Sequence, residues 1–294
     1  MPLEQKKGLL GRLSSRLSRM KSESVRMPTE EDKAGFLKAQ RMGYDCVTTV
    51  EKELREGYTE KQAARLLDTY LKDHGVRVYL HRPFAWFGDH ARFDGYRRFT
   101  QFHPSKRILN ADEPFILDVS PVVDGYSGDI GYSTCLRPNV DLDYGMNFLL
   151  RLRAKIPQYF ASDMNASEIW WKIDQEVREN GFDNVHAKYP LSVLGHRVYR
   201  FKLPNLRLPR IPVSASSWFS LQGQYEFLTH KIMPDLLGPD HEGSKLGLWA
   251  IEPHLGRGKV GFKFEEILVV EENQAYWLDD NVPHVRRAKT GVTP

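Results

Sequence analysis

The sequence predicts an α+β fold, because its helical patterns and its strand patterns occur in separate runs along the chain. Two helical segments come first, a β-hairpin and further helices follow, and mostly strand-like segments complete the sequence. Helices and strands that alternated one by one would instead predict a parallel sheet with crossover helices. The chain has 294 residues, of which 41% are hydrophobic and 12% aromatic, so it can bury a sizeable core.

Residues 1–27 differ in composition from the rest of the chain. Basic side chains and leucines recur there at helical spacing, which predicts a basic amphipathic helix. Such an arm could bind a membrane surface or a partner, or it could be a terminal helix that docks on its own domain or on a second subunit. The sequence leaves both interpretations open, and we expect the main domain to cover residues 28–294.

The first two helices of that domain are predicted from their capping signals. Thr29 with Asp32 resembles a capping box, and a roughly helical apolar face follows it. Thr59 with Gln62 caps a second helix, which Gly75 ends at a position suited to a left-handed residue. Both helices precede the first strands.

The strand signals that follow centre on a β-hairpin. Residues 76–87 are rich in β-branched and aromatic side chains. The apolar runs 115–123 and 126–136 are separated by Asp124-Gly125, a dipeptide favoured in tight hairpin turns. Two helices are then expected, at residues 142–160 and from an Asn165/Glu168 capping pair to Gly181, before the remaining strands.

Two aspartates mark this hairpin as the chemical centre. Asp118 and Asp129 lie on its two arms, with the turn almost midway between them, so we expect their carboxylates to face one another. Like charges opposed across a hairpin destabilise it unless a cation lies between them. A metal ion would supply that cation, although either aspartate could instead be a turn or edge residue.

Three later segments continue the pattern. They are His196 directly after a glycine, a Glu-Pro pair that begins at Glu252, and Glu265 just before an apolar strand. With the two aspartates, which are eleven residues apart, they resemble the ordered Asp, Asp, His, Glu, Glu ligand set of the superfamily of methionine and Xaa-Pro aminopeptidases. The resemblance extends over roughly residues 33–280. It implies the pita-bread fold, in which a curved antiparallel sheet is covered by helices.

The resemblance also implies a site for two divalent metal ions. Its ligands would be Asp118, Asp129, His196, Glu252 and Glu265, with Asp129 and Glu265 bridging the two ions. Carboxylates and an imidazole, without thiolates, suit Mn²⁺, Fe²⁺, Co²⁺ or Zn²⁺. In this family a water held between two metals is the nucleophile, so the resemblance implies hydrolysis of an amide bond.

Further roles follow from the same resemblance. Glu252 would pass a proton from the water to the leaving amine. His103 would contact the substrate, as would Lys263, which stands where Xaa-Pro enzymes usually carry arginine. His254 replaces the more usual glycine after the Glu-Pro pair and could add a contact, although a surface position is the alternative for either histidine. We expect Glu266 to support the ligands or to face solvent, and an exchange of roles between it and Glu265 stays open.

The pocket departs from the family pattern while the ligand set does not. Proline-specific members usually carry histidines where this chain has Ser192 and Leu203. This predicts altered substrate choice rather than lost chemistry. We expect an aminopeptidase similar to Xaa-Pro aminopeptidases. The alternatives are a non-catalytic pita-bread module that binds peptide, protein or RNA, and a metal-dependent hydrolase of a non-peptide amide.

Bulk properties limit the partners and the compartment. A formal charge of +4 gives no reason to expect nucleic-acid binding. The two cysteines lack metal-ligand spacing, and we find neither a bilayer-spanning apolar run nor a secretory signal, so we expect a cytoplasmic protein. We expect a peptide or small amide substrate, and the chain could form a homodimer. The proline-rich segment 201–247 could be a lid over the pocket or a surface excursion.

Overall fold

The computed structural model describes residues 27–201, residue 223 and residues 235–290. The predicted N-terminal arm and most of the segment 201–247 lie outside these ranges, so both interpretations remain predictions. Helices and antiparallel strands occur in separate runs within the described ranges, which confirms the predicted α+β class.

The two N-terminal helices begin at the predicted capping residues. The Thr29 hydroxyl accepts a hydrogen bond from the backbone N–H of Asp32, whose carboxylate accepts one from the N–H of Thr29. Thr59 and Gln62 form the same reciprocal pair. Each pair satisfies two N–H groups that would otherwise lack partners. The two helices are α2 (Glu30–Glu53) and α3 (Glu60–Asp73).

The central hairpin turns at Asp124-Gly125, as predicted. Its strands are β3 (Pro114–Val119), β4 (Pro121–Val123), β5 (Tyr126–Ser127) and β6 (Ile130–Cys135). Asp124 and Gly125 adopt positive φ angles of 53° and 89°, which this type of two-residue turn requires. β4 pairs with β5 next to the turn, and β3 pairs with β6 beyond it.

The register of this hairpin differs from our prediction. The loop contains only Asp124 and Gly125, and this fixes the pairing of every residue in the two arms. Asp118 therefore lies opposite Gly131, while Asp129 precedes β6. The prediction that the two aspartates face each other directly is wrong. They are diagonal neighbours, a separation of about 7–8 Å that side chains can still span.

Alternate residues of β3 face opposite sides of the sheet. Phe115, Leu117 and Val119 pack in one apolar cluster with residues of α2 and α3. Ile116 belongs to a different cluster, and Asp118 shares its side of the strand. The hairpin therefore presents Asp118 on the face that points away from these two helices.

The strand predicted at residues 76–87 is interrupted. It forms β1 (Val78–Tyr79), which pairs with β4, and β2 (Phe84–Phe87), which pairs with β3. The intervening residues include His81, followed by Arg82 and Pro83. Proline has no N–H to donate to a sheet, which is consistent with the break.

The two helices predicted in the middle of the chain are present, and Asn165 with Glu168 caps the second as expected. A short C-terminal helix was not predicted. Val282 and Val285 pack into the core at its start, but two valines in a basic segment give too little helical pattern to recognise. These helices are α4 (Val140–Ala161), α5 (Ala166–Glu179) and α7 (Pro283–Thr290).

Within the part of the chain that the structure describes, the remaining strands complete four antiparallel sheets. They are β7 (Asp183–Asn184), β8 (Gly195–Arg197), β9 (Leu236–Leu237), β10 (Gly247–Ile251), β11 (His254–Arg257), β12 (Val260–Lys263), β13 (Glu266–Val270) and β14 (Ala275–Trp277). The strand orders are β1-β4-β5, β2-β3-β6, β12-β11-β7 and β14-β13-β10-β8-β9. Short 3₁₀ helices are η1 (Gly88–Arg92), η2 (Phe99–Phe102), η3 (His186–Lys188) and η4 (Pro190–Ser192).

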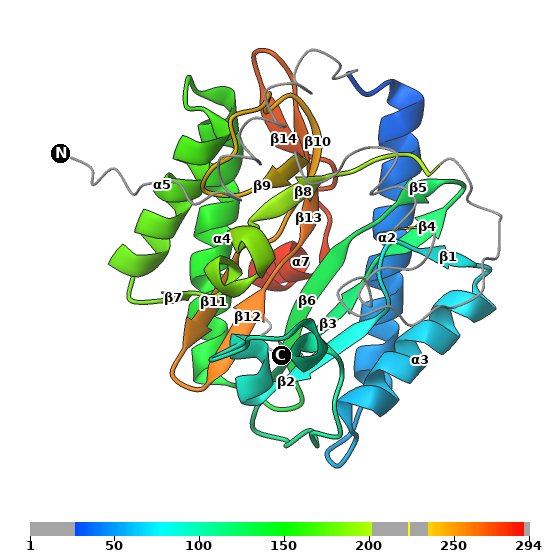
Figure 1. Cartoon of the computed structure of the whole chain (residues 1–294). Helices are drawn as coiled ribbons and strands as arrows, with labels where there is room; N and C mark the ends of the chain where they lie inside the picture. Colours follow the sequence, from blue (N-terminus) through cyan, green and yellow to red (C-terminus); the bar gives the residue numbers. More distant parts are fainter. Residues whose placement is uncertain (1–26, 202–222, 224–234, 291–294) are drawn as a thin grey trace.

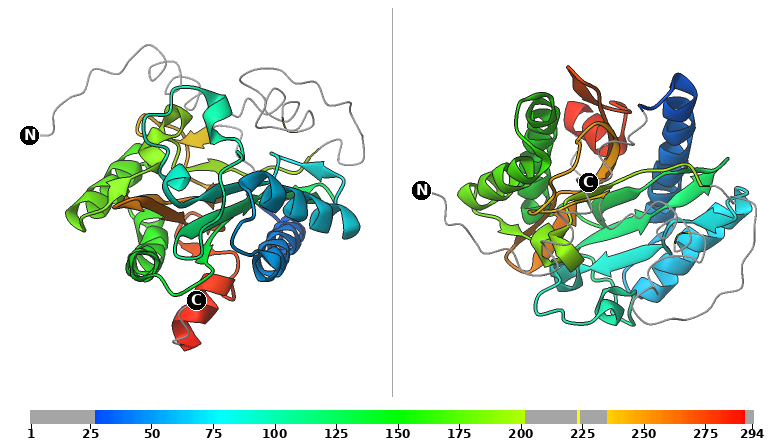
Figure 2. Two further views of the ribbon diagram at one scale, coloured as in Figure 1. Left: turned by 90° about the horizontal axis from the view of Figure 1, so that it is seen from below. Right: turned by 45° about the horizontal axis from the view of Figure 1, so that its top comes forward.

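The helices flank the strands in pairs. Figure 1 shows α2 with α3 and α4 with α5 on either side of the strands. In the left view of Figure 2, α2, α4 and α7 lie on the same side of the strands. Among the described helices, none combines the length and the apolarity that a bilayer span requires.

Candidate metal centre

Strands from both halves of the chain carry the five predicted metal ligands. Asp118 lies on β3, and Asp129 directly precedes β6. His196 is the central residue of β8, which pairs with β10, and Glu252 directly follows β10. Glu265 lies between β12 and β13. Each ligand is thus on or beside a paired strand, which limits its freedom to move.

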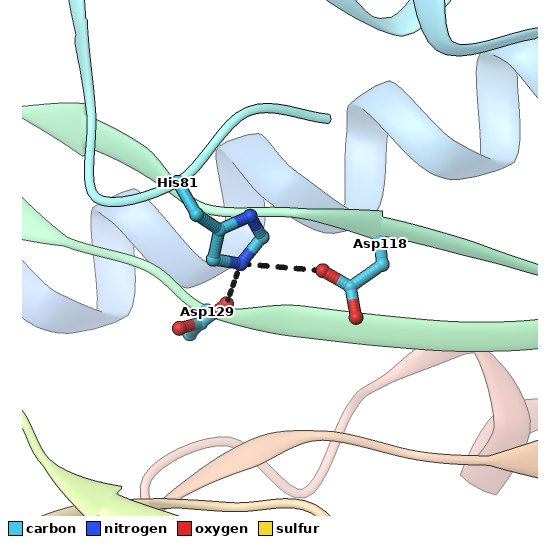
Figure 3. Close-up of side chains that lie close together, drawn as sticks. All are labelled: His81, Asp118 and Asp129. Carbon is cyan, nitrogen blue, oxygen red and sulfur yellow. Dashed lines mark hydrogen bonds and ion pairs between the residues drawn. The ribbon is translucent and has the colours of Figure 1, made fainter. Parts of the chain in front are cut away.

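Asp129 lies at the centre of the group. Its Oδ1 atom is 3.0 Å from Nε2 of His81 (Figure 3), and its Oδ2 atom is 2.9 Å from Nε2 of His196. The same His81 nitrogen lies 3.3 Å from Oδ1 of Asp118. The Asp129 carboxylate therefore contacts both His81 and His196, and His81 also contacts Asp118.

Lys263 joins the other carboxylates. Its ammonium nitrogen lies 2.8 Å from Asp118 Oδ2, 2.8 Å from Glu252 Oε2 and 2.9 Å from Glu265 Oε2, and the side chain is only 1% exposed. Gly131 makes room for it, because a Cβ atom there would lie 2.1 Å from Cε of Lys263. Together with the contacts of Asp129, these ion pairs bring all five predicted ligands into one cluster.

The buried acids perturb one another. Burial raises the pKa of Glu265 well above its ordinary value, and the charge of Asp129 raises it further against the attraction of Lys263. Burial also raises the pKa of Glu252. Burial alone would raise the pKa of Asp129 as well, but its two histidine neighbours outweigh this effect and lower it. A pocket with this excess of acids attracts cations.

The pKa values of the two basic residues, Lys263 and His81, are raised by the carboxylates around them. Burial opposes the charge on Lys263, but Asp118 and the two glutamates outweigh it and raise the pKa of Lys263 well above its usual range. Burial would likewise lower the pKa of His81, yet Asp129 and Asp118 raise it to about 9. Both bases therefore serve to balance carboxylate charge.

The donor atoms present suit divalent metal ions. Two groups of three residues, which share Asp129, can each offer ligand atoms that all lie within 4.8 Å of one another. These groups are His81, Asp118 and Asp129, and Asp129, His196 and Glu265. Lys263 binds only one oxygen of Asp118, and the other, Oδ1, is buried without a hydrogen-bond partner among the described residues. Carboxylate oxygens with imidazole nitrogens form a set that first-row divalent ions prefer.

Comparison with known families agrees with this chemistry. Residues 34–272 match the sequence profile of metallopeptidase family M24. The chain belongs to this family. M24 enzymes use divalent metal ions, and the His and carboxylate cluster of this chain is a candidate site for them. None of the curated proteins compared with the chain is significantly similar to it in sequence.

Solved structures share the fold of this M24 chain. It is similar to an X-Pro aminopeptidase from Thermotoga maritima, with a TM-score of 0.61 and 14% identity over 92% of this chain and 65% of that one. It is also similar to a dipeptidase from Pyrococcus horikoshii (0.61, 15%, over 92% and 64%) and to the dipeptidase PepE from Mycobacterium ulcerans (0.61, 18%, over 89% and 61%). The chain thus spans slightly less than two thirds of each. The family match and these likenesses confirm the predicted pita-bread fold.

The residues predicted to contact substrate lie around the cluster in different ways. His103 is half-buried and stacks on Phe84, the residue opposite Asp118 in the β2–β3 pair. His254 is fully buried, with Nδ1 2.9 Å from the Tyr189 hydroxyl. Neither histidine belongs to the two ligand groups. Their substrate contacts, and that of Lys263, stay predictions.

Glu266 is not a solvent-facing residue of this M24 chain, contrary to one of the two roles considered for it. It is fully buried, and the Arg153 guanidinium donates to both of its carboxylate oxygens at 2.7 Å. His284 also lies 2.7 Å from it, and neither Glu266 nor His284 belongs to the two ligand groups. Glu265, and not Glu266, joins the cluster.

Sequence reasoning missed His81. No motif surrounds this residue, and we had predicted a continuous strand across it. The available signal was Arg82-Pro83, which breaks the strand just before Phe84, the pairing partner of Asp118. A histidine placed at that break lies within reach of the first aspartate.

Proposed function

We propose that this M24 chain is a dinuclear metal-dependent aminopeptidase, similar to Xaa-Pro aminopeptidases, that releases N-terminal residues from peptides. The observation that carries the proposal is the convergence on Asp129 of two ligand groups, each of which contains a histidine and a second carboxylate. The solved neighbours are called X-Pro aminopeptidase, prolidase or dipeptidase, so action near the end of a peptide is the shared theme.

The proposed ligands are Asp118, Asp129, His196, Glu252 and Glu265, for two ions of Mn²⁺, Co²⁺, Fe²⁺ or Zn²⁺. Such ions supply Lewis acidity toward the scissile carbonyl and lower the pKa of water. Asp129 would fix the spacing of the two half-sites, because its two oxygens point to different histidines. Lys263 would hold three of the ligand carboxylates in place and balance part of their charge.

Glu252 is the residue that we propose for proton transfer to the leaving amine. Its side chain is 13% exposed, whereas those of Asp118 and Glu265 are 4% and 3% exposed. It therefore has the best access to a substrate among the three carboxylates that Lys263 binds. His103, which is half-buried beside the β2–β3 pair, would contact the peptide.

The setting of the reaction is also a proposal. Cys46 and Cys135 are both buried free thiols, which supports activity in a reducing compartment such as the cytoplasm. We further propose that residues 28–294 form the catalytic domain and that the arm, residues 1–27, contributes to a homodimer contact.

Metal content and hydrolysis, measured on the same samples, test this function. The purified protein is stripped with chelator, reloaded with Mn²⁺, Co²⁺ or Zn²⁺, analysed for bound metal, and incubated with a mixed peptide library. We expect about two ions per chain and release of N-terminal residues. Asp129→Asn should lose both properties.

Asp174→Asn is the matched control, because Asp174 is also a buried aspartate but binds Arg178 and Asn184 away from the cluster. It should keep metal and activity. A wild-type protein that binds no metal would favour the binding-module alternative. One that binds two ions but leaves every peptide intact would favour the hydrolase of a non-peptide amide.

A further inference from the structure

One more histidine reaches the same carboxylates as the predicted ligands. His81, in the break between β1 and β2, is only 12% exposed and directs Nε2 toward Asp118 and Asp129 (Figure 3). The distances are 3.3 Å to Asp118 Oδ1 and 3.0 Å to Asp129 Oδ1. Two atoms bound to one ion at about 2.0–2.2 Å and at right angles lie about 3 Å apart. His81 is therefore spaced from these oxygens as ligands of a shared ion would be.

The second nitrogen of His81 is also placed as in a metal ligand. Nδ1 lies 2.8 Å from the carbonyl oxygen of Arg82. A carbonyl can only accept, so Nδ1 carries a hydrogen. When the ring loses its second proton, as metal binding requires, Nε2 presents a lone pair to the carboxylates. A backbone carbonyl that fixes the tautomer in this way is the usual support of a metal-binding histidine.

His196, a ligand in the proposed function, has the same arrangement. Its Nδ1 lies 3.2 Å from the carbonyl oxygen of the next residue, Arg197, and its Nε2 lies 2.9 Å from Asp129 Oδ2. Each oxygen of Asp129 thus faces one histidine, and Nδ1 of each histidine donates a hydrogen bond to the backbone carbonyl of the next residue. The two half-sites therefore have the same arrangement of histidine and backbone carbonyl on either side of the Asp129 carboxylate.

An unsatisfied acceptor provides independent support. Oδ1 of Asp118 is buried and accepts no hydrogen bond from any described residue, although Oδ2 is bound by Lys263. The 3.3 Å contact of Oδ1 with His81 Nε2 is an ion pair only while that ring is protonated, so beside a neutral ring this buried oxygen lacks a partner, which is costly. A cation between this oxygen and the His81 lone pair would satisfy both atoms.

We propose that His81 is a sixth protein ligand, which shares one divalent transition-metal ion with Asp118 and Asp129 while His196 binds the other. This inference rests on the proposed function, because it assumes that the cluster binds metal. It gives each ion an imidazole, and a second imidazole should favour Zn²⁺, Co²⁺ or Fe²⁺ over Mn²⁺.

The test compares Co²⁺ binding by the full chain before and after His81→Phe. Chelated protein is titrated with Co²⁺, and stoichiometry is read from visible absorption and from metal analysis after gel filtration. We expect wild type to bind two ions, and His81→Phe to bind one as tightly and the second at least about 100-fold more weakly. His186→Phe, which replaces a fully buried histidine outside both ligand groups, should still bind two.

A second measurement does not depend on how the variant folds. In Co²⁺-loaded wild type, each metal-bound imidazole should give one strongly shifted, solvent-exchangeable Nδ1–H proton signal in the NMR spectrum. Two such signals are expected, and only one would overturn the proposal. Unchanged binding of both ions by His81→Phe would also overturn it while leaving the proposed function intact, whereas wild type that binds no ion would refute the proposed function itself.

Discussion

Replacing Lys263 by methionine should reveal the electrostatic repulsion among the buried carboxylates. Methionine keeps much of the length and volume of lysine but removes the charge, so Asp118, Glu252 and Glu265 would face one another without their shared cation. We expect the metal-free variant to be strongly destabilised. Bound metal should restore most of the lost stability, because the ions would neutralise the same carboxylates.

The contact distances allow an estimate of the unfolding free energy that the Lys263→Met variant loses. At an effective dielectric constant of about 20, two unit charges about 2.8 Å apart attract by about 6 kcal/mol. Lys263 makes three contacts of 2.8–2.9 Å, but desolvation and the mutual repulsion of the acids offset much of this attraction. Removal of one member of a buried ion pair typically costs about 3–5 kcal/mol, and we expect a loss in that range.

Urea unfolding at pH 8, with chelator and with saturating Co²⁺, measures the effect. Lys155→Met is the control, because Lys155 is 49% exposed and its ion pair with Glu176 should contribute less than about 1 kcal/mol. The reasoning is refuted if chelated Lys263→Met has the unfolding free energy of the wild type. It is also refuted if Co²⁺ stabilises the variant no more than it stabilises the wild type.

Three further predictions follow from the same region. Gly131→Ala should destabilise the protein by about 1–3 kcal/mol, because the new methyl group would overlap Lys263, and a double-mutant cycle with Lys263→Ala should show coupling rather than additivity. The folded-state pKa of His81 is raised from 6.5 to about 9, so the folded protein holds the proton more tightly. In the metal-free protein, the stabilisation that protonated His81 provides should therefore be fully present below about pH 6.5. About 3 kcal/mol of the unfolding free energy should be lost as the pH rises through about 9. Urea unfolding should find no such loss in His81→Phe. Glu266→Gln should cost about 3–5 kcal/mol, because the buried Arg153 charge would keep only the exposed Asp280 as its charged partner. Metal analysis should still find two ions, and a loss of metal would contradict the separate role of Glu266.

Local signals in the sequence predicted most of the elements. Thr29, Thr59 and Asn165 each cap a helix through the residue three positions later, and these contacts need no information from the rest of the fold. The turn at Asp124-Gly125 is equally local. The order of the ligand motifs then indicated the family, and the profile match over residues 34–272 confirms it.

What the sequence did not predict depends on pairing and on distant contacts. The position of Asp118 opposite Gly131 follows from the number of loop residues, and our estimate of the turn centre was not fine enough to set it. The ion pairs of Lys263 require strands β3 and β12 to approach, and no local pattern reports that approach. His81 was missed for the same reason, since only the tertiary structure brings it to Asp129.

The division of the ligands between the two halves of the chain has a consequence for biosynthesis. Lys263 and Asp118, which meet in the cluster, are 145 residues apart in sequence, and Glu265 lies still closer to the C-terminus. Contacts of such long range close slowly and only after the intervening chain exists. A nascent chain that has emerged only as far as the hairpin would carry proposed ligands for one ion at most, because His196, Glu252 and Glu265 come later in the sequence. Metal insertion should therefore follow translation, with the ions entering a pocket whose carboxylates Lys263 already holds together against their mutual repulsion.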